Sequence, residues 1–363
     1  MPCESKPLTV GLIGCGRMGQ CYAEALDALP DTQLVAIAEN NAERLQAVGA
    51  RFGIESLFST AAELFARITP DIAIVVLPGK YIKDAVLAAV AAGVRGIATE
   101  KPIGAVLSDV DAMINACATA NIVFAGGSLQ RAMTEVQQAA TRLRSGEFGT
   151  PIGACVHRFG GEISGGGCQH IAVLRLLTGA EITEVTAWGE PEAALHAESD
   201  EGLNINGQFH LSNGIVCSVF SGATPHTGVD VWTQDALIRW DWGPPQIFRG
   251  ADDQGNRIPI NPEYAPAAFP QFGYTGTSLL SFVDVVRRGV EHESELVISA
   301  RDLRASLEVA IAARQSALLG NIAISLPLAD RSLHLYPRAY RWLGGDQSGL
   351  PQSVDEAGGS TNK

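Results

Sequence analysis

A glycine-rich hexapeptide near the N-terminus constrains the fold more than any other feature of the chain. Gly14-Cys15-Gly16-Arg17-Met18-Gly19 has the spacing GxGxxG and joins the apolar run LTVGLI to the amphipathic segment MGQCYAEALDAL. Glycine is common in turns of every kind, but a strand before the motif and a helix after it are typical of dinucleotide-binding units. Gly14 permits a tight turn, Gly16 lets a pyrophosphate reach backbone N–H groups, and Gly19 lets helix and strand pack closely. We therefore predict that residues 14–19 bind a dinucleotide, with a purely structural turn as the alternative.

The pattern around this motif predicts a doubly wound α/β domain over residues 1–125. Short β-branched runs alternate with amphipathic stretches, which is typical of a parallel sheet with crossover helices. We expect one capping box at Thr60 and Glu63, another at Ser108 and Asp111, and a helix that ends at Gly93. The clearest strands are LTVGLIG, QLVAIAE, DIAIVVLP, RGIATE and NIVFAGG.

A second, mixed α+β domain is expected over residues 126–335. The segment TEVQQAATRLRSGEFG is predicted to be helical, and GQFHLSN, GIVCSVFS and DALIRW alternate as antiparallel strands with one exposed face do. A Gly/Pro/Trp-rich region from about 243 to 275 indicates long loops, and two further helices follow in TSLLSFVDVVRRG and DLRASLEVAIAARQSALLG. Residues 336–363 are polar and glycine-rich, and we expect them to form a disordered tail.

Glu39 indicates which cofactor the first domain prefers. It ends the second strand, twenty residues beyond Gly19, where an acidic side chain commonly accepts hydrogen bonds from the ribose hydroxyls of adenosine. A carboxylate there would repel a 2′-phosphate, and no arginine follows before Arg44, so NAD is favoured over NADP. An ordinary solvated glutamate is the alternative. Leu77 and Pro78, at the end of DIAIVVLP, are also assigned to the cofactor site.

The triplet Glu100-Lys101-Pro102 is the first candidate for chemistry. It stands at the carboxyl end of the strand RGIATE, the edge where open parallel sheets place their ligands. Glu100 and Lys101 would then border the cofactor, and a lysine facing the nicotinamide can exchange a proton with a substrate. The alternative is a surface lysine at a strand-to-loop junction.

His170 is the second candidate for chemistry. It begins the apolar helix HIAVLRLLTG directly after Gly165-Gly166-Gly167. The partial positive charge of a helix N-terminus disfavours imidazolium, so the ring would stay neutral and able to accept a proton. The alternative is a buried histidine that satisfies backbone groups.

Composition and spacing argue against several other classes of function. A net charge of −13 over 363 residues repels nucleic acid and anionic lipid, and no apolar run is long enough to span a bilayer. Seven scattered cysteines without a CxxC pair favour a reducing cytoplasm over a disulfide framework or zinc site. His157, His210 and His226 lie at no metal-ligand spacing, so we predict no metal. Trp232, Trp240 and Trp242 could stack on a sugar face, although core packing is the commoner role.

Taken together, these residues resemble the glucose-fructose oxidoreductase / inositol dehydrogenase / MocA (Gfo/Idh/MocA) family, whose members join GxGxxG, an EKP triplet and a distal histidine in this order. The similarity extends to Arg131, to SGEFGTPIGA and to the stretch from Tyr274 through Ser316. It implies a Rossmann domain joined to a domain with a large, mostly antiparallel open sheet that mediates homodimers or homotetramers.

The resemblance also implies a reaction and a set of site residues. The expected reaction is hydride transfer between NAD(P) and a hydroxyl-bearing carbon of a sugar, cyclitol or related polyol, with Lys101 and His170 sharing the proton. Which of the two is the base stays open. Arg131, Glu162, His170 and Tyr274 are the expected substrate contacts.

One departure from the family pattern bears on this expectation. The family often carries an aspartate four residues before the histidine, and Gly166 stands there in this chain. Either Glu162 or another group orients His170, or the substrate and mechanism differ, or ordinary turnover has been lost. Two alternative functions follow from the same resemblance: a redox-elimination glycosidase that keeps its NAD, and a non-catalytic NAD-binding regulator, against which the retained Lys101 argues.

Overall fold

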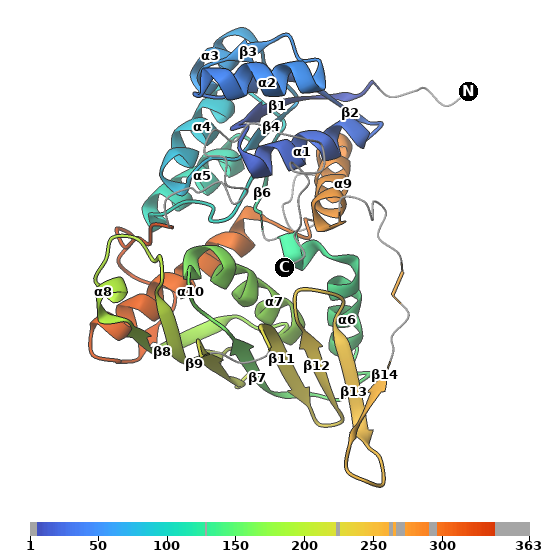
Figure 1. Ribbon diagram of the computed structural model, residues 1–363, viewed down its shortest axis with the longest axis vertical. Helices are drawn as coiled ribbons and strands as arrows, with labels where there is room; N and C mark the ends of the chain where they lie inside the picture. Colours follow the sequence, from blue (N-terminus) through green and yellow to red (C-terminus); the bar gives the residue numbers. More distant parts are fainter. Residues whose placement is uncertain are drawn as a thin grey trace.

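The computed structural model describes residues 6–127, 129–222, 226–260, 264–265, 273–289 and 296–337. Over these residues the chain builds two sheets, one above the other in Figure 1, with α6, α7 and α10 between them. The predicted fold class is confirmed, because the first sheet is parallel and the second is mostly antiparallel. Within the described ranges no helix is long and apolar enough to cross a membrane.

The N-terminal sheet has six parallel strands in the order β3-β2-β1-β4-β5-β6. β4 and β5 are buried along their whole length, as expected where helices cover both faces of a parallel sheet. All five strands read from the sequence are present. The strands are β1 (Leu8–Ile13), β2 (Thr32–Ala38), β3 (Leu57–Phe58), β4 (Ile72–Val75), β5 (Gly96–Thr99) and β6 (Val123–Ala125). The helices are α1 (Arg17–Ala28), α2 (Ala42–Phe52), α3 (Ala61–Arg67), α4 (Gly79–Ala92) and α5 (Leu107–Thr119).

The ends of these helices test the predicted caps. Thr60 accepts a hydrogen bond from the backbone of Glu63, and Gly93 ends α4 in the left-handed conformation, so both signals are confirmed. The capping box at Ser108 and Asp111 is wrong, because α5 already begins at Leu107 without a side-chain cap. Asp111 instead forms ion pairs with Arg304 and Arg331.

The second sheet has nine strands in the order β14-β13-β12-β11-β7-β10-β9-β8-β15. Only the pair β7 and β10 is parallel among the described neighbours. The strands are β7 (Pro151–His157), β8 (Ile182–Glu190), β9 (Asn204–Leu211), β10 (Val216–Phe220), β11 (Gly228–Thr233), β12 (Ala236–Trp240), β13 (Gln246–Ala251), β14 (Arg257–Ile260) and β15 (Ile324–Ser325). The helical segments are η1 (Leu129–Ala132), α6 (Thr134–Arg144), the π-helical turn η2 (Ile163–Gly167), α7 (Cys168–Thr178), α8 (Glu192–Leu195), α9 (Gly273–Arg288) and α10 (Ala300–Leu318).

The region from 243 to 275, expected to form long loops, contains the hairpin of β13 and β14. Ile247 is buried in the core, and Pro259 is accommodated because β14 is the edge strand of the sheet. The prolines and glycines of this stretch predict loops, but β13 and β14 form because β13 pairs with β12 of the sheet.

Two further segments complete the architecture. α9 returns to the N-terminal sheet, where Phe282 and Val286 lie against Gly96 of β5. Of the predicted tail, Tyr336 is still tied to the fold through its carbonyl, which accepts from the backbone of Asp200. Residues 338–363 lie outside the described residues.

Candidate active site

The glycine loop after β1 has the geometry that a pyrophosphate requires. Gly14 adopts φ 92°, and a Cβ there would lie 2.1 Å from the carbonyl oxygen of Val76. A Cβ on Gly19 would lie 2.1 Å from the carbonyl oxygen of Gly14, so glycine is needed at both positions. α1 starts at Arg17 without a side-chain cap, which leaves its first N–H groups available to an anion.

Glu39 lies at the edge of this loop and is nearly buried. Its carboxylate accepts from the backbone N–H groups of Cys15 and Asn41, both at 2.9 Å, and forms an ion pair with Arg44 at 3.2 Å. Sequence reasoning treated Arg44 as too distant to matter, but α2 brings its guanidinium onto the carboxylate. The pair puts one acidic and one basic group where the adenosine ribose of a dinucleotide would lie.

Leu77 and Pro78 flank the opposite side of the loop. A Cβ at Gly14 would lie 3.0 Å from Cδ2 of Leu77, so this side chain borders the turn directly. Pro78 is exposed and precedes the first residue of α4. Leu77 therefore lies beside the glycine loop, and Pro78 follows it at the start of α4.

Glu100 anchors the strand end that carries Lys101. Its buried carboxylate accepts from the hydroxyl of Tyr22 at 2.8 Å and from the backbone N–H of Lys101 at 3.0 Å. Burial raises the pKa of Glu100, while the Lys101 ammonium and the Tyr22 hydroxyl partly oppose this. Sequence reasoning missed Tyr22, which lies in α1 and ties the glycine-loop helix to the lysine.

His170 lies in an aromatic surround rather than at a free helix end. The π-helical turn η2 leads directly into α7, so His170 is the third residue of a helix that already has a preceding turn. Its ring packs edge-on against Phe159, Trp240 and Trp242 at centroid distances of 6.5, 5.9 and 5.3 Å. The sequence predicted that the helix N-terminus keeps the imidazole neutral; in the structure, burial of the ring is the main cause.

The imidazole is neutral and lacks the hydrogen bonds that a structural histidine would make. Burial lowers the pKa of His170 to about 4, opposed in part by the Gly166 backbone. The Gly166 backbone is near enough to act on this pKa, but neither ring nitrogen has a partner of normal hydrogen-bond geometry among the described residues, although the residue is only 3% exposed. Buried unpartnered nitrogens cost free energy, which is expected where a ligand later supplies the missing bond.

Contacts through the backbone connect Lys101 with α7. Gln169 donates to the carbonyl of Gly127 at 3.3 Å, and a Cβ on Gly127 would lie 2.8 Å from the backbone nitrogen of Lys101. The Lys101 ammonium also acts electrostatically on the buried thiol of Cys168, two residues before His170. The two predicted catalytic residues thus approach the same junction between the domains.

No carboxylate takes the place of the missing aspartate among the described groups at His170. A Cβ at Gly166 would meet no atom within 4 Å, so the position is open space. The carboxylate of Glu162 lies over Gly165, and that of Asp200 accepts from the backbone of Ser164 at 2.6 Å. Burial raises the pKa of Asp200 to about 6, but neither acid contributes to the electrostatics of His170.

Arg131 and Tyr274, two of the predicted substrate contacts, are not assigned to the site. The guanidinium of Arg131 donates to the carbonyls of Val297 and Ala172 and pairs with Asp302, which joins η1 to α7 and α10. These contacts occupy Arg131 in packing, and we leave it out of the proposed substrate site. Tyr274 belongs to the first turn of α9, and its side chain lies outside the described residues.

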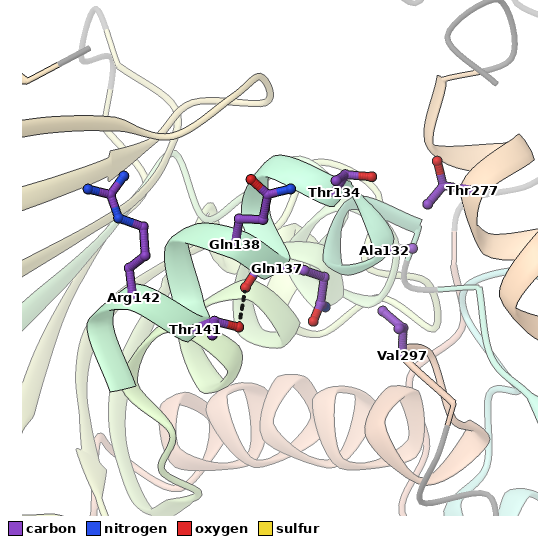
Figure 2. Close-up of a pocket in the computed structure, with 8 residues that line it drawn as sticks. All are labelled: Ala132, Thr134, Gln137, Gln138, Thr141, Arg142, Thr277 and Val297. Atoms are coloured by element: carbon purple, nitrogen blue, oxygen red, sulfur yellow. Dashed lines mark hydrogen bonds between the residues drawn. The ribbon is translucent and has the colours of Figure 1, made fainter. Parts of the chain in front are cut away.

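A cavity of about 460 Å³ lies along α6 (Figure 2). It contains none of the predicted site residues. Its polar groups are hydroxyls, amides and Arg142, which is already paired with Glu147. The lining residues are Ala132, Thr134, Gln137, Gln138, Thr141, Arg142, Thr277 and Val297. We therefore assign the chemistry to the junction and not to this cavity.

Comparison with known proteins agrees with the geometry. Residues 8–127 match the family GFO_IDH_MocA, described as an oxidoreductase family with an NAD-binding Rossmann fold. D-apiose dehydrogenase of Paraburkholderia graminis is 31% identical over 141 residues, 39% of this chain and 37% of that protein. Myo-inositol 2-dehydrogenase of Thermotoga maritima is 27% identical over 144 residues, 40% of this chain and 43% of that protein. The matched part thus spans less than half of either relative.

The fold comparison extends over both domains. A levoglucosan dehydrogenase, solved in complex with NADH and levoglucosan, superposes with a TM-score of 0.75. The superposition covers 89% of this chain and all of that chain at 20% identity, which establishes a shared fold. Residues 8–127 therefore match the Gfo/Idh/MocA oxidoreductase family, the same family that the sequence motifs resemble.

Proposed function

We propose that the protein is an NAD-dependent dehydrogenase that oxidises a hydroxyl-bearing carbon of a sugar, cyclitol or related polyol. The observation that carries the proposal is the pair of unpartnered ring nitrogens on His170, which lies at the same junction as Lys101. A hydroxyl group can supply a hydrogen bond to such a nitrogen. The matched relatives named for D-apiose and myo-inositol support the same substrate class.

The first domain fits NAD. The turn at Gly14, the close approach at Gly19 and the uncapped N-terminus of α1 form a cradle for a pyrophosphate that side chains would fill. Glu39 is placed to accept from ribose hydroxyls, and its ion pair compensates the positive charge of Arg44. This pairing favours NAD over NADP. Bound NAD supplies the acceptor for a hydride.

We assign different roles to the two catalytic groups. As the C–H bond of the substrate carbon breaks and gives up a hydride, the hydroxyl on that carbon loses its proton and becomes a carbonyl. Nζ of Lys101, after losing a proton to solvent, takes this proton as the neutral amine and becomes an ammonium; the side chain is partly exposed and can exchange protons with solvent. The buried, neutral His170 holds the substrate oxygen by a hydrogen bond instead.

The decisive experiment is a panel of sugars, cyclitols and glycosides incubated with NAD, with nicotinamide absorbance and product analysis measured together. We expect stoichiometric NADH and a ketone or lactone product from at least one sugar or cyclitol. Glycoside cleavage without net NADH would favour the redox-elimination alternative. Tight NAD binding with no product from any compound would favour the regulator.

We also propose a homodimer or homotetramer that works in a reducing cytoplasm. The outer face of the nine-stranded sheet carries Trp188, Val216 and Phe220, each 42 to 50% exposed in the single chain. Exposed apolar side chains grouped on one sheet face are typical of subunit interfaces. The six cysteines in the described ranges form no disulfide with one another, which fits a reducing compartment.

A further inference from the structure

Among the aromatic neighbours of His170 in the described residues, only Trp242 reaches solvent. Phe159 and Trp240, the other two rings around the imidazole, are both fully buried, whereas Trp242 is 38% exposed. Its ring stands perpendicular to the imidazole, with the centroids 5.3 Å apart. A molecule that approaches His170 from solvent therefore meets the indole of Trp242.

The position of this indole is fixed from several sides. Trp242 follows β12 and adopts φ 57°, a left-handed conformation that a bulky residue seldom takes. Its Nε1 donates to the hydroxyl of Thr227 at 3.2 Å, and Trp240 lies against it at 5.1 Å between centroids, tilted by 39°. Contacts with Thr227, just before β11, and with Trp240 of β12 thus hold the aromatic ring of Trp242 beside the proposed catalytic histidine, on a residue with an unusual backbone conformation.

We infer that Trp242 is a specificity-determining residue that stacks on the apolar face of a ring-shaped substrate. This inference rests on the proposed dehydrogenase function for the substrate class and narrows it. A pyranose or cyclitol presents several C–H groups on one face of a rigid ring, and an indole covers such a face with large apolar area. An open-chain polyol has no preformed face and must order several rotatable bonds to make the same contact. The site therefore selects cyclic over acyclic substrates.

The open space at Gly166 supports the same assignment. A Cβ there would meet no described atom within 4 Å, so no described residue fills the side of η2 and α7 that leads to His170. A ring stacked on Trp242 needs room of this kind between the indole and α7. The missing side chain at Gly166 leaves space for a ring-shaped substrate, and the indole of Trp242 offers a flat apolar surface for it.

The test compares Trp242→Ala and Trp242→Phe with the parent enzyme, using D-glucose and myo-inositol as ring probes and D-glucitol as the acyclic probe. Binding in the presence of NAD is measured by saturation-transfer NMR, and turnover by NADH absorbance. We expect Trp242→Ala to weaken ring binding and raise its KM by about tenfold or more, with kcat within about threefold. Trp242→Phe should retain most of the ring preference.

Controls separate stacking from a general loss of structure. Ile322→Ala removes another exposed apolar side chain, just before the edge strand β15 and far from β12 in the sheet, and should leave both probe classes unchanged. Unchanged NAD affinity shows that each variant is folded. Equal losses for ring and acyclic probes, no loss for either, or absence of ring binding in the parent protein would each overturn the inference. If ring probes bind and their binding depends on Trp242, but none is turned over, the stacking role of Trp242 would stand and the proposed dehydrogenase function would be refuted.

Discussion

Lys101 stands at the end of β5, held through its own backbone rather than through its ammonium. Glu100 fixes the N–H of Lys101, and Tyr22 fixes Glu100, so the side chain can change without loss of these contacts. Lys101→Met keeps the apolar stem and removes the charge. We expect the variant to fold and to bind NAD, while kcat falls about 10²–10⁴-fold, the usual effect of losing a proton-transfer group.

Steady-state kinetics with a parallel NADH titration checks this prediction. If Lys101→Met retained activity within about threefold of the parent, a difference below ~1 kcal/mol, Lys101 would be a structural lysine. A His170→Ala variant that was also fully active would leave the regulator hypothesis ahead of the dehydrogenase.

Gly166 offers a second test at the level of one residue. It lies one helical turn before His170, and the space around its Cβ position is open, so Gly166→Asp can be accommodated. A carboxylate there would favour imidazolium and should raise the pKa of His170 from its present value of about 4 by roughly 1–3 units. An NMR titration of the His170 ring measures the shift. Gly166→Asn has the same shape without the charge, and an equal shift in that variant would contradict the electrostatic argument.

At the scale of elements, three neighbouring strands are joined by a charged cluster on the outer sheet face. His157 of β7 contacts Asp230 of β11 at 3.2 Å, and Arg239 of β12 binds the same carboxylate with two bonds of 2.8 Å. Hydrogen bonds to Asp230 and Cys155 raise the pKa of His157 to about 9. His226 lies near Arg239 and shares the cluster.

This cluster predicts how stability depends on pH. The pKa of His157 in the folded state exceeds its unfolded value near 6.5, so its stabilisation is complete below pH 6.5 and is lost as pH rises through about 9. We expect the free energy of unfolding to fall over this window by about 1 kcal/mol or more, since the pair is only partly exposed. Urea unfolding at pH 6 and pH 9.5 measures the change. His157→Gln should lose most of it, and a variant with the parent's pH dependence would refute the assignment.

The elements that the sequence predicted well are those set by local signals. The alternation around β1, β2, β4, β5 and β6, the cap at Thr60 and the stop at Gly93 each depend on a few neighbouring residues. Asp111 was misread because its partners, Arg304 and Arg331, lie 193 and 220 positions away. The surround of His170 could not be predicted for the same reason, since Phe159 follows β7 and Trp240 ends β12, far from His170 in the sequence. The spacing of motifs in the sequence was enough to predict Lys101 and His170 as catalytic candidates. The groups that surround them are set by contacts between distant parts of the chain, which the sequence pattern does not show.

At the scale of the whole molecule, the two faces of the nine-stranded sheet are unequal. α6, α7 and α10 lie over the inner face, between the two sheets (Figure 1). On the outer face, Trp188 and Phe220 come from strands that both flank Asn206 of β9, so an apolar patch forms in the middle of the sheet. No described element of the chain packs over this patch.

A second subunit is the cover that this patch requires. We expect light scattering at micromolar concentration to show a dimer or tetramer, because a stable interface needs about 800 Å² from each partner and a broad open sheet face can supply it. Phe220→Glu places a charge within the patch and should shift the protein towards monomer. Ile322→Glu makes the same change at a residue that is 50% exposed just before the edge strand β15 and should leave the assembly intact. A parent protein that stays monomeric, or equal effects of the two substitutions, would mean that the outer face is not the interface. Because β10 of this patch pairs with β7, and Phe159 beside His170 follows β7 in the chain, assembly through the patch would also restrain one side of the aromatic surround of His170.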